Sequence, residues 1–420
     1  MSARRGGWYY GWNIVAVCVL SQVASMGLTF NAFSLFLRDW AADLHTGISQ
    51  LQFAMLTLTV VGAVFGPIAG ALGDRLPPRR LFGAGLLGTA CFYFGIGSAT
   101  AAWQIVVLYG FAAIAVGVCT AITSNALIPR WFARRRGVAL GISAFGIGLA
   151  GVILPPIIAA VLPDVGWRAI WHFGAALLAF IVAPLVVLVL RDHPTEREGL
   201  HYLTGSGSSL AVHGHRTSSG QLGWRDILKS RNYWLIISVF VPVLSTYGGV
   251  SYNLAPYAVA RGLGEQSAGM LLSLLSTATI VATLALGFLS DRFGNRMLLA
   301  GLAVSVALGA SLLAFAQDLS TVATGCVLIG FGGGLFTPLA AGLAREFGAE
   351  GTGLAFGMCM VFVPVATVSA VGIARTQEVT GSYAPALITL TFLVLAGGML
   401  VLLLREKQAD QLIPGLTPAH

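Results

Sequence analysis

The sequence has very little charge. Of its 420 residues, 24 are basic and 16 are acidic, so charged residues make up 10% of the chain. Soluble domains carry about 25%. Hydrophobic residues make up 56%. A soluble fold needs polar groups on its surface, so this composition excludes a soluble enzyme. A lipid bilayer is the solvent that suits such a chain.

Cysteine is also scarce, and no cysteine pair has the spacing of a metal or redox site. Each of the five lies within an apolar stretch: Cys18, Cys91, Cys119, Cys326 and Cys359. Such thiols are typical of buried small hydrophobic residues. The sequence shows no metal-ligand cluster, nucleophile elbow or phosphate loop, and Gly332 to Gly334 lie inside an apolar span. We therefore expect no cofactor, no metal and no enzymatic activity.

Long apolar stretches are what the sequence does contain. A helix needs about 20 apolar residues to cross a bilayer core of about 30 Å. Twelve stretches meet this length within a few residues: 11–37, 48–73, 81–100, 103–128, 137–162, 168–190, 232–257, 267–290, 297–316, 320–344, 352–374 and 382–404. The 53 glycines fit helices that approach one another closely in lipid. We predict an all-α membrane protein of twelve transmembrane helices.

A polar segment divides these spans into six and six. Residues 191–231 are rich in Gly, Ser and charge, and we read them as a cytoplasmic linker. The predicted organisation is a six-helix bundle over 1–190, this linker, a second six-helix bundle over 232–404, and a cytoplasmic tail over 405–420. Part of the linker, from Trp224 to Lys229, is expected to form a short surface helix.

Basic residues are concentrated on one side of the predicted spans. With the N-terminus inside, 20 of the 24 lie in inward segments. The four outward ones are Arg38, Arg168, Arg261 and Arg375. Cytoplasmic loops carry an excess of Lys and Arg, so both termini are predicted to be cytoplasmic. Because the net charge of +8 is spread over these loops rather than over one folded face, it does not predict a nucleic-acid partner.

One loop motif occurs twice, at matching places in the two halves. The copies are Gly70-Ala-Leu-Gly-Asp-Arg-Leu-Pro-Pro-Arg-Arg and Gly287-Phe-Leu-Ser-Asp-Arg-Phe-Gly-Asn-Arg, each after the second span of its half. This motif resembles the signature loop of the major facilitator superfamily, although Pro77 replaces a Gly in the first copy. An Asp at a helix end can pair with Arg or cap a neighbouring helix. The resemblance implies a conformational latch at Gly70, Asp74, Arg75, Arg79, Gly287, Asp291, Arg292 and Arg296, which we call the candidate latch.

Five further segments narrow the resemblance: Tyr10-Gly-Trp12, 130–137, Gly166-Trp-Arg168, 252–262 and Thr380-Gly-Ser-Tyr383. As an ordered set they are similar to the monocarboxylate and oxalate/formate exchanger branch. That branch implies transport of a small organic acid by rocker-switch alternating access. Its charged site positions fall at Asn31, Thr279 and Thr283 here, which are all neutral. The neutral positions keep open a second reading, a carrier or exporter of a neutral or amphipathic compound.

Candidate cavity residues are polar or aromatic and lie near mid-span on the helices that line the cavity in this superfamily. They are Gln22, Asn31, Phe33, Thr120, Ser124, Asn125, Ser245, Thr246, Tyr247, Phe336 and Thr337, with Thr279 and Thr283 added by the resemblance. Each single hydroxyl has the alternative of a helix-to-helix bond. His172 is read either as a structural hydrogen-bonding group or as a proton or substrate contact. Arg38 and Arg168 are read either as interfacial anchors or loop-pairing groups, or as groups that attract substrate.

The expected partners are a small-molecule substrate and the lipid bilayer. A coupling ion or a counter-substrate is open, as is the direction of transport. We expect a monomer in a bacterial inner membrane, which the preference for Arg over Lys favours. A receptor or scaffold that kept a transporter fold is a further alternative.

Overall fold

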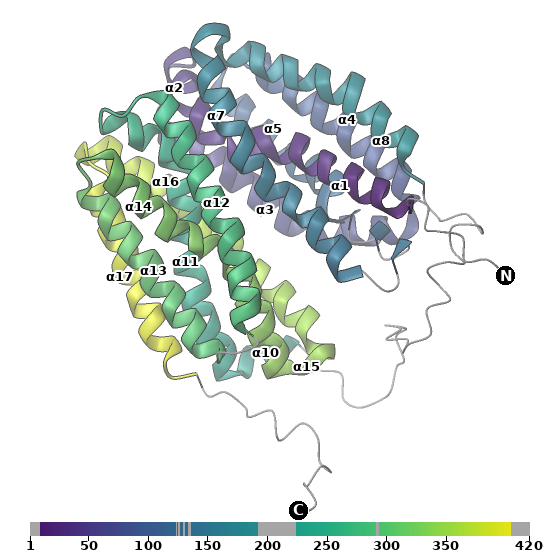
Figure 1. The fold of residues 1–420 in the computed structure, drawn as a ribbon. Coiled ribbons are helices and arrows are strands. Elements are labelled where there is room, and N and C mark those ends of the chain that lie inside the picture. The colour runs from purple at the N-terminus through teal and green to yellow at the C-terminus, as the bar shows by residue number, and fades with distance from the viewer. Residues whose placement is uncertain are drawn as a thin grey trace, which may run out of the picture. The chain divides into compact units, whose positions relative to one another are not determined.

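The computed structural model describes residues 9–122, 124, 127, 128, 131, 132, 136–191, 224–290 and 294–404. The ordered elements of these residues are all helices (Figure 1). The helices of the first half are α1 (Gly11–Met26), η1 (Gly27–Asn31), α2 (Phe33–Asp43), α3 (Ile48–Arg75), α4 (Pro78–Gly97), α5 (Ala102–Gly117), η2 (Val118–Ile122), α7 (Arg136–Leu177), η3 (Leu178–Val182) and α8 (Ala183–Val189). Those that follow are α10 (Trp224–Lys229), α11 (Arg231–Ala260), α12 (Glu265–Ser290), α13 (Asn295–Phe315), α14 (Leu319–Gly330), η4 (Phe331–Leu335), α15 (Phe336–Met360), α16 (Val363–Thr380) and α17 (Ala384–Val401).

Within the described residues, eleven helical stretches are long and apolar enough to cross a membrane. One of them, Val138–Val189, has 52 residues. As a straight helix it would be about 78 Å long, more than twice the hydrocarbon core. Gly166 interrupts it with a non-helical φ of 75°, so this stretch contains two spans. The prediction of an all-α membrane protein with twelve spans is confirmed. The short helix predicted from Trp224 to Lys229 is confirmed as α10.

Residues with positive φ occur in matching turns of the two halves, as the loop motif does in the sequence. His45 and Gly262 both have positive φ, at 49° and 78°, and each lies in the turn after the first span of its half. Gly166 and Gly381 also have positive φ, at 75° and 72°, and each lies in the turn before the last span of its half. Glycine takes this left-handed conformation without the steric cost that a Cβ brings. The two halves of the chain therefore share their turn geometry as well as their loop motif.

The chain divides into two compact units. Unit 1 comprises residues 1–216 together with 251–277 and 370–381, and unit 2 comprises 217–250, 278–369 and 382–420. Unit 1 thus contains segments from both sequence halves. The linker residues 192–223 and the tail 405–420 lie outside the described part, so the predicted bundle boundaries stay a prediction.

Aromatic rings form the core at one end of unit 1. Phe33, Phe36 and Trp40 occupy one face of α2, because they are three and four residues apart. All three are fully buried. The ring centroid of Trp40 lies 5.7 Å from that of Phe36 and 5.9 Å from that of Trp171 on α7. This packing fixes α2 against the part of α7 that follows Gly166.

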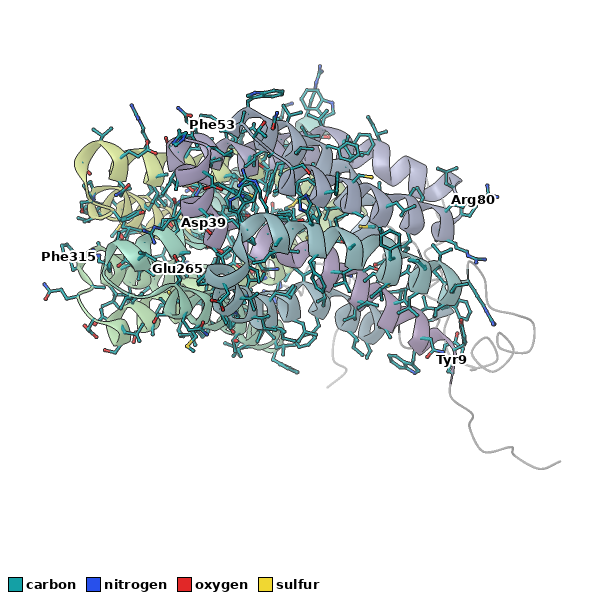
Figure 2. All side chains as sticks on the ribbon, turned by 90° about the horizontal axis from the view of Figure 1, so that it is seen from above. Tyr9, Asp39, Phe53, Arg80, Glu265 and Phe315 are labelled. Atoms are coloured by element: carbon teal, nitrogen blue, oxygen red, sulfur yellow. The ribbon has the colours of Figure 1, made fainter. Side chains whose placement is uncertain are left out.

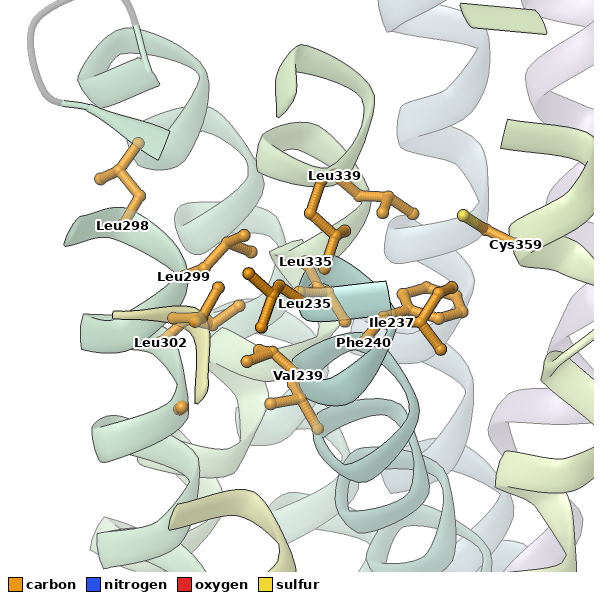
Figure 3. Packing of buried hydrophobic residues seen from close by; sticks show 14 of the residues in the cluster. Leu235, Ile237, Val239, Phe240, Leu298, Leu299, Leu302, Leu335, Leu339 and Cys359 are labelled. Atoms are coloured by element: carbon orange, nitrogen blue, oxygen red, sulfur yellow. The ribbon is translucent and has the colours of Figure 1, made fainter. Parts of the chain in front are cut away.

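The core of unit 2 is mainly aliphatic and connects α11, α13, η4 and α15 (Figure 3). Members of this core that are three or four residues apart share one face of their helix, and Leu235 and Val239 on α11 are an example. The residues include Leu235, Val239, Phe240, Leu299, Leu302, Leu335 and Leu339.

Labelled residues mark the two ends of unit 1 in Figure 2. Asp39 and Glu265 lie close together at one end, and Tyr9 and Arg80 lie at the other. We call the first the Asp39 end. The sequence predicts that it faces outward, because it carries the outward Arg38 while Arg80 belongs to an inward loop.

Candidate functional site

In unit 1, the candidate residues of the first span lie along α7. Gln22 is 2% exposed, and its Nε2 donates a hydrogen bond of 2.8 Å to Ser143 Oγ. Its Oε1 has no partner among the described residues. Asn31 is half-buried, and its Nδ2 lies 3.4 Å from Met26 O and 3.5 Å from Ile147 O. Asn31 therefore keeps hydrogen-bonding capacity that its long contacts do not use.

Irregular helical turns coincide with these candidates. Asn31 closes the π-helical turn η1, and Thr120 lies in the π-helical turn η2. Thr120 has φ −119° and ψ −115°, which breaks the helical path of its span. Its hydroxyl donates to Val116 O at 2.7 Å. Single π-helical turns interrupt the regular backbone ladder and are frequent at functional sites.

A seam of small residues joins α7 to α12 within unit 1. A Cβ on Gly151 would collide with Ser276 Oγ and would lie 2.7 Å from Asn31 Oδ1, so only glycine admits both side chains. A Cβ on Gly269 would lie 2.6 Å from Ala159 Cβ. This seam was not predicted from the sequence. Its signal is the stripe Gly269, Ser273, Ser276 at helical spacing, a pattern that permits close helix packing in membranes.

A proline explains one hydrogen bond of the seam. Pro156 lies inside α7 and has no N–H, so it cannot donate to the carbonyl of Val152, four residues earlier. Ser273 Oγ donates to that Val152 O at 2.7 Å. The hydroxyl of α12 thereby satisfies a carbonyl that the proline leaves without its helical partner.

Several charged groups of unit 1 lie at the Asp39 end. Arg38 and Glu265 form an ion pair at 3.6 Å, with side chains 47% and 40% exposed. Burial raises the pKa of Asp39, and the carboxylate of Glu265 adds to this effect. Asp43 accepts from Trp167 Nε1 at 2.8 Å and from Arg168 at 2.5 Å.

These two hydrogen bonds lower the pKa of Asp43. Arg168 therefore forms a loop pair, as one of its two sequence readings has it.

In unit 2, a hydroxyl cluster forms around the three-glycine turn. Thr279 Oγ1 lies 2.9 Å from Gly330 O and 3.4 Å from the hydroxyl of Tyr247. A Cβ on Gly333 would lie 2.5 Å from Thr279 Cγ2 and 2.9 Å from Tyr247 Cε2. The 3₁₀ turn η4 thus brings backbone against two candidate residues, Tyr247 and Thr279.

The remaining candidates are placed as follows. Phe33 is fully buried in the aromatic core, and Ser124 and Ser245 are buried. Thr246 and Thr283 donate to carbonyls of their own helices, Pro242 O and Thr279 O, at 2.9 and 2.8 Å. Phe336 is 38% exposed with its ring 5.9 Å from that of Phe240, and Thr337 is half-buried. Asn125 lies outside the described residues.

His172 makes its described polar contact to a neighbouring span. Its Nε2 lies 3.1 Å from Ser98 Oγ, and its ring lies 5.2 Å from that of Phe94, a side chain 61% exposed. This is the contact that the structural reading of His172 expects.

The candidate latch is described only in part. Gly70, Asp74 and Arg75 belong to α3, but their surroundings lie outside the description, as do Asp291 and Arg292 altogether. Gly287 lies in α12, while Arg79 and Arg296 lie in the first turns of α4 and α13 and have interaction partners. The latch role stays a prediction.

Known proteins resemble this chain along its length. The family model for the Major Facilitator Superfamily matches residues 17–362 and 254–417. An MFS transporter of Aspergillus flavus, asaE, is 25% identical over 87% of this chain and 78% of its own length. Human monocarboxylate transporter 12 is 23% identical over 68% of this chain, which spans only 58% of that relative.

A solved structure shows the same fold. It is a bacterial homologue of the human lysosomal transporter Spinster, described as inward-facing and unoccupied. It superposes with a TM-score of 0.72, covers 95% of this chain and 98% of its own, and is 13% identical. The family match covers most of the sequence, and the helical fold agrees with it. The chain belongs to the major facilitator superfamily and is a multi-pass membrane transporter.

Proposed function

We propose that this protein is a secondary transporter of a small organic acid that works by rocker-switch alternating access. The observation that carries the mechanism is the composition of unit 1. Segments 251–277 and 370–381 of the second half pack into the same unit as the first half, at the end predicted to face outward. Alternating access requires such a closed end on one side of the site. The relatives named monocarboxylate transporter 12 support the substrate class.

The second candidate is a carrier of a neutral or amphipathic compound. The specific observation in its favour is that Asn31, Tyr247 and Thr279 offer amide and hydroxyl groups rather than a fixed cation. A carboxylate in a dry cavity needs a cation or several donors. A neutral or protonated ligand needs only the groups these residues supply.

Uptake into proteoliposomes separates the two candidates. The panel contains mono- and dicarboxylates, each with its neutral amide analogue, presented with and without a pH gradient. Saturable carboxylate uptake, blocked by Asn31→Leu but not by Asn13→Leu in the same membrane span, supports the first proposal. Saturable uptake of the amides alone replaces it with the second. If neither the carboxylates nor their amides were taken up, both candidate functions would be refuted.

We further propose that the candidate latch sits on the cytoplasmic side of a bacterial inner membrane. Asp74→Asn and Asp291→Asn are then expected to slow transport while leaving membrane insertion intact. Full transport rates in both variants would contradict the latch role. Maleimide labelling of cysteines placed in the linker tests the orientation, because the proposal requires them to be protected from reagent added outside intact cells.

A further inference from the structure

Two buried amides join α3 to the second-half segments of unit 1. Gln52 is fully buried, and its Nε2 donates to Tyr252 O at 2.9 Å and to Asn253 Oδ1 at 3.1 Å. Asn253 is 2% exposed, and its Nδ2 donates onward to Ala370 O at 3.0 Å. One chain of hydrogen bonds thus runs from α3 through α11 to α16.

A carboxylate makes a second connection one turn nearer the helix start. Glu378 on α16 accepts from Ser49 N at 2.8 Å and from Ser49 Oγ at 2.7 Å. The backbone N–H groups at the start of a helix lack partners within that helix. Glu378 satisfies one of them across 329 residues of sequence. A Cβ on Gly47 would lie 2.7 Å from Glu378 Oε1, so the missing side chain of Gly47 makes room for this cap.

Ser49 and Gln52 are three residues apart and therefore share one face of α3. We call Ser49, Gln52, Asn253 and Glu378 the α3 ladder. We propose that the α3 ladder is the closing contact of the outer side of this transporter. The inference rests on the proposed alternating access and assigns its outer closure to named residues.

Because its two amides are buried, the ladder is expected to favour two states, a closed dry end and an open hydrated end. In a dry interface an amide N–H without an acceptor is costly, so the donations from Gln52 Nε2 and Asn253 Nδ2 hold the closed end, while Gln52 Oε1 has no partner among the described residues. When water enters, it replaces each of these hydrogen bonds, and the net loss per bond becomes small. A contact that is strong when dry and inexpensive to hydrate favours either a closed or a fully open end over partial opening.

The exposed ion pair at the same end cannot take this role. Arg38 and Glu265 are 3.6 Å apart, with side chains nearly half exposed. Exposed pairs contribute little and are weakened further by salt. The closure is therefore expected to depend on the buried amides Gln52 and Asn253 and to vary little with ionic strength.

The test measures access to a site beyond the ladder. Ser276 lies about three turns below Glu265 on α12, which is about 16 Å along a helix. In a Cys91→Ser background, Ser276→Cys is reacted with a membrane-impermeant maleimide added outside. Gln52→Leu and Asn253→Ala are each expected to raise the labelling rate at least tenfold. Two control variants, Arg38→Gln and Thr59→Val, should each change the labelling rate less than twofold. Thr59 is a suitable control because its hydroxyl donates to its own helix.

A second variant guards against misfolding as the cause. Ser49→Cys with Glu378→Cys is bridged by a short bis-methanethiosulfonate reagent, which forms a disulfide with each thiol and releases two sulfinates. The bridge should abolish both outside labelling and transport until reduction of the two disulfides restores them. Unchanged labelling in both Gln52→Leu and Asn253→Ala, or full transport in the bridged protein, would overturn the assignment. Labelling requires no substrate, so a ladder that behaves as expected in a protein that moves no carboxylate would count against the substrate proposal only.

Discussion

Replacing Ser273 should show whether its hydroxyl substitutes for the backbone N–H that Pro156 lacks in the seam between α7 and α12. Ser273→Ala removes the donor to Val152 O, which Pro156 already deprives of its helical partner. The part-buried carbonyl of Val152 is then left without this hydrogen bond. In a Pro156→Ala background the new Ala N–H can donate to Val152 O within α7. The same Ser273→Ala change should then cost almost nothing.

The magnitude follows from this difference in hydrogen bonding. An unsatisfied buried carbonyl costs about 1–3 kcal/mol. Hydrogen bonds between membrane helices average about 0.6 kcal/mol and reach about 1.7 kcal/mol. We expect Ser273→Ala to lower the free energy of unfolding by about 1 kcal/mol with Pro156 present and by a few tenths with alanine there. The coupling free energy between the two sites is therefore about 1 kcal/mol.

Unfolding in mixed detergent with increasing SDS, followed by helical circular dichroism, measures all four proteins of this cycle. Thr277→Ala is the matched control, because its hydroxyl bonds Ser273 O in its own helix at 2.8 Å. Its effect should be the same in both backgrounds. An equal loss for Ser273→Ala with and without Pro156 would show that the serine does not replace the missing N–H.

Two further predictions concern other parts of the molecule. Gly333→Ala would place a Cβ 2.5 Å from Thr279 Cγ2, so overpacking should cost about 1–3 kcal/mol and impair transport. Gly301→Ala has nothing within 4 Å and should keep wild-type melting and uptake; equal behaviour of the two variants would contradict this reading. The pKa of Asp43 is lowered in the folded protein, so the stability that this carboxylate provides is present above its unfolded value of 3.8 and is lost as the pH falls from there through the lower folded pKa. The difference in melting temperature between the wild type and Asp43→Asn should accordingly narrow as the pH falls from 3.8 and close once the pH is below the folded pKa. A difference that does not change over this range would argue against the contact.

The sequence by itself determined the class of protein and the positions of its helices. Apolar runs of about 20 residues have one physical solution in lipid, because every backbone group must be bonded within the segment. Predicted spans such as 48–73 and 267–290 therefore agree closely with Ile48–Arg75 and Glu265–Ser290. The repeated loop motif indicated the duplicated halves, and the turns at His45 and Gly262 repeat in the same way.

The tertiary structure alone decided which polar residues meet. Gln52, Asn253 and Glu378 look ordinary in the sequence, because their partners lie in the other half of the chain. Ser273 gained a role only because α12 lies beside the carbonyl that Pro156 frees. Several predicted cavity hydroxyls, such as those of Thr246 and Thr283, turned out to bond their own helices. Helical periodicity gives the face of a residue on its own helix, but the neighbour opposite that face depends on how the helices pack, which no local pattern encodes.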